Sequence, residues 1–124
     1  MRILLVDDEQ ELVSTLAERL RLRGIEADWA TSGEDALKKA EEVSYDLAVL
    51  DIKIPRISGI NLKKELQKKS GFMKFVFMTG HGSDEDFQAG AAEAGMEYYL
   101  VKPVNIEILI EKMNRALRPE GGSI

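Results

Sequence analysis

The sequence predicts an α/β fold, a single doubly wound sheet of five parallel strands with helices on both faces. Two observations support this prediction. Short apolar runs recur five times along the chain, and an amphipathic helical pattern follows each of them. Four of the runs are nearly continuous, as in strands that are buried on both faces of a parallel sheet. Strict strand–helix alternation with right-handed crossovers favours the strand order 2-1-3-4-5.

The predicted strands are the apolar runs themselves. They span residues 3–6, 25–30, 47–50, 75–78 and 98–101. The second run is interrupted by Glu26 and Asp28 and so alternates between polar and apolar residues. A strand with one polar face fits an edge better than the centre of a parallel sheet, so we expect this run at an edge.

The predicted helices carry apolar residues at helical spacing. These stripes are Leu12-Val13-Leu16-Leu20, Ala36-Leu37-Ala40, Leu62-Leu66, Phe87-Ala91-Ala94 and Ile106-Leu109-Ile110-Met113-Leu117. We expect Gly24 to end the first helix, and the run from Thr31 to Glu34 to cap the second. The third helix is expected after Ser58-Gly59 and the fifth after Asn105. The fourth, expected over 83–95, contains an internal glycine that costs about 1 kcal/mol relative to alanine.

Composition fits one globular domain that binds neither membranes nor nucleic acid. The chain has 124 residues, 44% of them apolar and 31% charged, and we expect a domain over 1–118 with a flexible tail or linker stub over 119–124. The absence of cysteine excludes disulfides and thiolate metal sites. No apolar run approaches the roughly 20 residues that span a bilayer, and no signal-peptide pattern is present, so the cytoplasm is expected. The net charge of -5 argues against direct nucleic-acid binding.

Polar residues follow four of the predicted strands. They are Asp7-Asp8-Glu9, Asp51, Thr79 and Lys102-Pro103. In a doubly wound sheet, ligands bind beyond the carboxyl ends of the strands, where the strand order reverses. That point lies between the first and third strands, so we expect these side chains to share one crevice.

This set of side chains fits phosphoryl transfer. Crowded carboxylates repel one another unless a cation lies among them, and Mg²⁺ (or Mn²⁺) prefers carboxylate, water and phosphate oxygens. Asp51 is then placed as the nucleophile that accepts a phosphoryl group. Lys102 can neutralise a phosphoryl oxygen, and Thr79 can donate a hydrogen bond to one. Each residue alone fits a turn, a cap or a surface charge, so the prediction depends on their combination.

Four motifs, in this order, resemble the receiver domain of two-component response regulators. They are Leu4-Leu5-Val6-Asp7-Asp8-Glu9, Leu50-Asp51-Ile52-Lys53-Ile54-Pro55-Arg56-Ile57-Ser58-Gly59, Met78-Thr79-Gly80-His81 and Tyr99-Leu100-Val101-Lys102-Pro103. The resemblance extends from Ile3 to about Leu117, and it agrees with the flavodoxin-like strand order 2-1-3-4-5. One mild departure is Ile54, where the family often has methionine.

The resemblance implies a magnesium site and a phosphoacceptor. Asp51 would accept the phosphoryl group. Asp8 and Asp51 would bind Mg²⁺ directly, with Asp7 assisting. The backbone carbonyl of Lys53 would be a further metal ligand. Lys102 and Thr79 would hold the phosphoryl group.

Other positions would regulate the switch. Tyr99 matches the family's aromatic switch residue, which would turn inward as Thr79 moves towards the phosphoryl group, whereas Tyr98 is the expected core residue. The side chains of Lys53 and His81 occupy positions that tune the phosphoryl lifetime. The peptide bond before Pro103 is expected to be cis.

The implied function is a phosphorylation-dependent signalling switch. The donor would be a histidine kinase or a histidine phosphotransfer protein, and the only reactions catalysed would be the domain's own phosphotransfer and autodephosphorylation. The output would be a changed surface on the fourth helix, fifth strand and fifth helix. The downstream target and phosphorylation-dependent dimerisation stay open.

Four alternatives remain at this point. The chain can be a receiver domain cut from a longer transcriptional regulator, or a receiver-like module that only binds partners. A flavin-binding electron carrier would need a loop after the first strand that attracts phosphate, and Asp7-Asp8-Glu9 repels it. An aspartate-nucleophile phosphatase would need a second Asp two residues after Asp51, where Lys53 stands.

Overall fold

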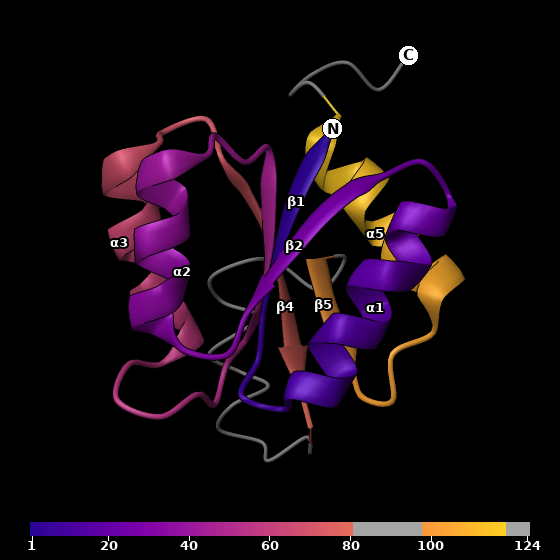
Figure 1. The fold of residues 1–124 in the computed structure, drawn as a ribbon, viewed down its shortest axis with the longest axis horizontal. Helices are drawn as coiled ribbons and strands as arrows, with labels where there is room; N and C mark the ends of the chain where they lie inside the picture. The colour runs from indigo at the N-terminus through magenta and orange to yellow at the C-terminus, as the bar shows by residue number, and fades with distance from the viewer. Residues whose placement is uncertain (81–97, 119–124) are drawn as a thin grey trace.

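A computed structural model describes residues 1–80 and 98–118, which form a five-stranded parallel sheet between two layers of helices (Figure 1). The elements in chain order are β1 (Arg2–Val6), α1 (Gln10–Leu22), β2 (Glu26–Ala30), α2 (Gly33–Glu42), β3 (Leu47–Asp51), α3 (Gly59–Lys69), β4 (Lys74–Thr79), β5 (Tyr99–Val101) and α5 (Ile106–Leu117). The sheet order β2-β1-β3-β4-β5 confirms the predicted order and the edge position of the second strand. The helix expected over 83–95 and the tail over 119–124 lie outside the described residues.

The sheet separates two apolar clusters, because neighbouring strand residues point to opposite faces. Ile3 and Leu5 of β1 join the cluster under α1 and α5, whereas Leu4 and Val6 join the cluster under α2 and α3. Figure 1 shows the two helix pairs on opposite sides of the sheet. All five residues of the central strand β3 are buried, as expected for a strand covered on both faces.

Local sequence signals set the helix boundaries where they were expected. The hydroxyls of Ser32 and Ser58 each accept a hydrogen bond from the backbone N–H three residues further on, at 3.1 and 3.2 Å. Asn105 caps α5 in the same manner. Gly24 has a φ of 80° just beyond α1, a left-handed conformation that glycine adopts without steric cost.

Two expectations about burial were wrong. Leu37 and Ala40, which the helical pattern predicts to be buried together with Ala36, are only partly buried, because α2 packs against β2 and β1 at the edge of the sheet. Tyr99 is 5% exposed and belongs to the core, while Tyr98, expected to be the core residue, is only partly buried and packs against the opposite cluster. Strand β5 begins at Tyr99, and Tyr98 precedes it. Because successive side chains of a strand point to opposite faces of the sheet, Tyr99 points into the core under α2 and α3.

Among residues 1–80 and 98–118, no helix combines the length and the apolar character that crossing a membrane requires.

Candidate functional site

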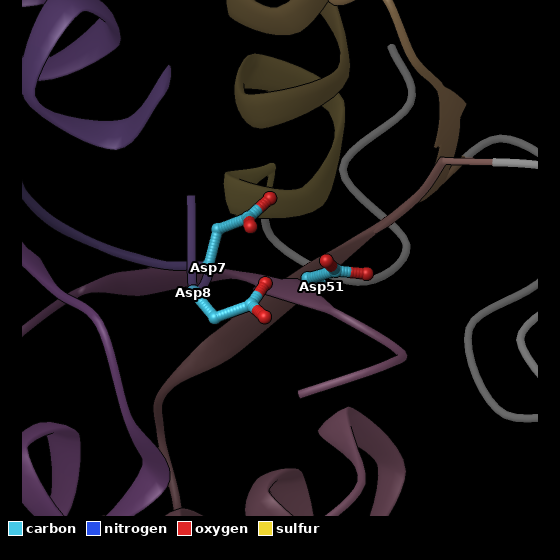
Figure 2. Close-up of side chains that lie close together, drawn as sticks. All are labelled: Asp7, Asp8 and Asp51. Carbon is cyan, nitrogen blue, oxygen red and sulfur yellow. The ribbon is translucent and has the colours of Figure 1, made fainter. Parts of the chain in front are cut away.

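The register of β1 and β3 brings the predicted acidic residues together. The two strands are adjacent and parallel, and Val6 pairs with Leu50, so the residues that follow them meet at one edge of the sheet. One carboxylate oxygen from each of Asp7, Asp8 and Asp51 lies within 4.8 Å of the others. Figure 2 shows the three side chains extending from the ends of β1 and β3 into the same region.

Backbone amides orient the two buried carboxylates. Asp7 is 0% exposed and Asp51 is 5% exposed. One oxygen of Asp7 accepts a hydrogen bond from the N–H of Glu9 at 2.9 Å, and one oxygen of Asp51 accepts from the N–H of Lys53 at 3.1 Å. Each aspartate thus bonds to the backbone two residues on, a local arrangement that Asp favours in turns.

A tight loop follows Asp51 and leads into α3. The N–H of Ile57 donates to the carbonyl of Pro55 at 2.9 Å, and Arg56 between them has a φ of 74°. This combination is a γ-turn of the rare, strained type. At the start of α3, a Cβ on Gly59 would collide with the backbone carbonyl oxygen of Asp51. A glycine there lets α3 begin directly against the strand that carries Asp51.

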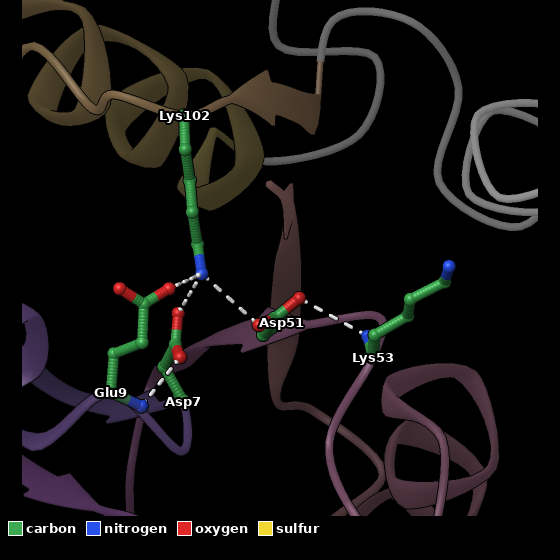
Figure 3. A network of polar contacts seen from close by, with 5 residues as sticks. All are labelled: Asp7, Glu9, Asp51, Lys53 and Lys102. Carbon is green, nitrogen blue, oxygen red and sulfur yellow. Dashed lines mark hydrogen bonds and ion pairs between the residues drawn. The ribbon is translucent and has the colours of Figure 1, made fainter. Parts of the chain in front are cut away.

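The ammonium group of Lys102 lies among the carboxylates of Asp7, Glu9 and Asp51 (Figure 3). Its Nζ is 2.5 Å from Asp7, 2.9 Å from Glu9 and 3.1 Å from Asp51, and its side chain is 12% exposed. The backbone N–H of Lys102 donates to the carbonyl of Thr79 at 2.8 Å, which joins the ends of β4 and β5. The Lys102–Pro103 bond is cis, as expected.

Sequence reasoning placed Lys102 near Asp51 but missed its contact with Glu9. The only sequence signal for Glu9 is that it continues the acidic run after β1. Glu9 precedes α1 at its N-cap position, but its side chain caps no backbone N–H there. Its carboxylate reaches instead across to the end of β5.

Burial and neighbouring charges shift the pKa values of Asp7 and Lys102. Burial raises the pKa of Asp7 to about 6, with a further rise from the negative charge of Asp51; the hydrogen bonds from Lys102 and the Glu9 backbone oppose this shift. For Lys102, burial alone would lower the pKa, but bonds to Asp7, Glu9 and Asp51 raise it above its ordinary value. Lys102 therefore stays charged at neutral pH.

Two of the remaining predicted residues, Thr79 and Lys53, lie at the same edge. Thr79 ends β4, directly after Met78, which pairs with Asp51. Its side chain is buried. Figure 3 shows the side chain of Lys53 pointing away from Asp51, although its backbone N–H contacts that carboxylate. His81 lies outside the described residues.

The three aspartates fit a hard divalent cation. They offer only oxygen atoms within a small region, and Mg²⁺ or Mn²⁺ prefers such ligands. Burial makes the charged form of Asp7 costly, so a cation there would relieve a real electrostatic penalty. The donor set contains no thiolate, and none is available in this chain.

Comparisons with known proteins agree with this geometry. The family model of the response regulator receiver domain matches residues 3–114. The two-component response regulator PhoP of Pseudomonas aeruginosa is 35% identical over 124 residues, which cover 100% of this chain and 55% of that protein. The CpxR homolog of Haemophilus influenzae is 38% identical over 117 residues, which cover 94% of this chain and 50% of that protein.

Solved structures show the same likeness. A CheY-like receiver domain protein from Methanospirillum hungatei is 34% identical, with a TM-score of 0.82 and coverage of 94% of this chain and 92% of that one. The response regulator TrrA from Thermotoga maritima, solved in complex with Mg²⁺ and BeF, is 39% identical, with a TM-score of 0.78 and coverage of 94% and 98%.

The chain spans about half the length of the curated relatives it matches. The matched family model covers most of its residues, including every strand end that contributes to the acidic site. The chain therefore belongs to the receiver domain family of two-component response regulators.

Proposed function

We propose that Asp51 accepts a phosphoryl group and that the domain acts as the switch this modification controls. One observation carries the proposal. Asp51 lies at the carboxyl end of the central strand, with one carboxylate oxygen 3.1 Å from Lys102 and with Asp7 and Asp8 beside it. This arrangement supplies a nucleophile, a cation for the phosphoryl oxygens and carboxylates for a metal.

The proposed reaction is an in-line displacement. A carboxylate oxygen of Asp51 attacks the phosphorus of a phosphohistidine, the new O–P bond forms, and the P–N bond to the imidazole breaks. Lys102 neutralises charge on the phosphoryl oxygens, and Thr79 at the end of β4 donates a hydrogen bond to one of them. Such catalysis is mainly positioning and charge neutralisation, and it produces a modified domain rather than a released product.

Asp7, Asp8 and Asp51, together with the backbone carbonyl of Lys53, are the proposed ligands of Mg²⁺ or Mn²⁺. When bound, the ion would offset the repulsion between these carboxylates and the incoming phosphoryl group. The acidic group around Asp51 supports this assignment.

The proposed output is a change on the surface that includes β5 and α5. Tyr99 of β5 is the proposed switch residue, coupled to movement of Thr79. Val101 and Ile108 are 52% and 47% exposed, so β5 and α5 present apolar side chains for a partner. The lifetime of the phosphoryl group would depend on the side chains of Lys53 and His81.

A histidine kinase or a phosphotransfer protein is the proposed donor. The proposed receiver domain covers residues 1–118, with 119–124 as a tail or linker. Because the matched relatives are about twice as long as this chain, the switch would act on an output domain or on a separate target. Membership of the receiver family removes support from the flavin carrier and phosphatase alternatives.

Phosphorylation of single-residue variants tests the proposal. The wild-type protein, treated with acetyl phosphate and Mg²⁺, is expected to gain one phosphoryl group by mass spectrometry. Asp51→Asn is expected to gain none. Asp35→Asn is a matched control, since Asp35 is a half-exposed residue of α2 paired with Lys39. Normal uptake by Asp51→Asn, or no uptake by the wild type, would refute the assignment.

A further inference from the structure

We infer that Glu9 is a displaceable counter-ion, which holds the Lys102 ammonium in the unmodified protein and gives up this contact to the phosphoryl group. This inference rests on the proposed function of Asp51. The Lys102 ammonium donates hydrogen bonds to Glu9 and Asp51 and forms an ion pair with Asp7. Carboxylates thus surround the ammonium, and a new phosphoryl oxygen would compete with one of them for Lys102.

Burial decides which partner can leave. The side chain of Asp7 is 0% exposed, and that of Asp51, which would carry the phosphoryl group, is 6% exposed. Backbone N–H groups also hold both carboxylates. Glu9 differs, because its side chain is 64% exposed. Within residues 1–80 and 98–118, the only hydrogen bond or ion pair of its carboxylate is the one with Lys102. Water can solvate the Glu9 carboxylate once it is released.

Figure 3 shows the geometry that makes this exchange direct. Glu9 and Asp51 approach the Lys102 ammonium from different sides, while Asp7 lies between them. The ammonium is held in place for an anion before any donor arrives. Glu9 is thus a positioning residue that acts through Lys102. Its negative charge also makes the Lys102 site less available to phosphate than an unpaired lysine would be.

This exchange predicts a specific effect of removing the Glu9 carboxylate. Glu9→Gln is expected to accept phosphoryl groups from acetyl phosphate about two- to fivefold faster, the change that releasing one partly exposed ion pair allows. Beryllofluoride, a phosphoryl mimic, is expected to bind the Mg²⁺-loaded variant more tightly by the same factor. The thermal midpoint should stay unchanged, because the Glu9 side chain is exposed and caps no backbone N–H of α1.

Two further variants distinguish the loss of the Glu9–Lys102 contact from the loss of a negative charge near the site. Glu11→Gln removes the same charge from an exposed residue in the first turn of α1, and it is expected to match the wild type. Glu9→Asp keeps the charge but shortens the side chain, so it should lose the 2.9 Å contact with Lys102. It is expected to behave like Glu9→Gln.

The outcomes are distinct. Faster uptake in both Glu9 variants, with Glu11→Gln unchanged, supports the exchange. Wild-type rates and beryllofluoride affinity in Glu9→Gln would overturn it while leaving Asp51 as the acceptor. An effect of Glu9→Gln that Glu9→Asp lacks would also overturn it, because simple repulsion of the donor would then explain the rates. If the wild-type protein gained no phosphoryl group at all, the proposed function and this inference would fail together.

Discussion

Replacing Asp7 by Asn should make the metal-free protein more stable at neutral pH. Asp7 is completely buried, and its pKa rises from 3.8 to about 6 in the folded protein. Between these values the folded state binds more protons than the unfolded state, so the free energy of unfolding falls as pH rises. The shift between the two pKa values corresponds to a loss of about 3 kcal/mol in the free energy of unfolding. This loss is absent at pH values below the lower pKa and complete above the upper one.

Urea unfolding of the wild type and Asp7→Asn measures this penalty directly. In EDTA, the stability of the variant relative to the wild type should increase by about 1–3 kcal/mol between about pH 4 and pH 8. The comparison cancels other titrating groups, which both proteins share. A pH-independent difference between the two proteins would show that the folded protein does not penalise the Asp7 charge.

Magnesium should reverse the order of stability. A cation bound at the ionised carboxylates stabilises the folded wild type in proportion to its occupancy, and Asp7→Asn lacks one of these charges. Under the proposed metal assignment, Mg²⁺ and a proton compete for Asp7, so the affinity for Mg²⁺ should rise with pH through about 6. Calorimetric titration would show this dependence, and an affinity that stays constant with pH would argue against Asp7 as part of the metal site.

Four other substitutions test the fold that holds the site. Leu20 is 0% exposed, and Leu20→Ala should lower the free energy of unfolding in urea by about 2–5 kcal/mol. Leu22 on the same helix is 80% exposed, and Leu22→Ala should lower it by less than about 0.5 kcal/mol. Equal losses would contradict the described packing of α1. Tyr45→Phe should cost about 1–2 kcal/mol, because it removes a 2.7 Å hydrogen bond to Asp28, and an unchanged unfolding midpoint would show this bond to be energetically neutral. Gly59→Ala should cost about 1–3 kcal/mol, because its methyl group would meet the backbone of β3; a neutral effect would mean that the loop before α3 adjusts freely.

The sequence alone determined the order of the elements and the location of the candidate site. Hydrophobic periodicity and capping residues act over a few neighbours, so the run from Thr31 to Glu34, Ser58-Gly59 and Asn105 predicted helix starts that the structure confirms. Strict alternation of strands and helices then left few topologies. Once the topology was known, the residues after β1 and β3 had to meet at one edge of the sheet.

Only the tertiary structure decided which side chains touch and how deeply each is buried. The contact between Glu9 and Lys102 joins residues 93 positions apart, and no local pattern specifies the rotamers that bring them together. The burial of Tyr99 rather than Tyr98 depended on where β5 begins, a boundary that apolar composition leaves undefined. The raised pKa of Asp7 has the same origin, because desolvation depends on atoms contributed by distant parts of the chain.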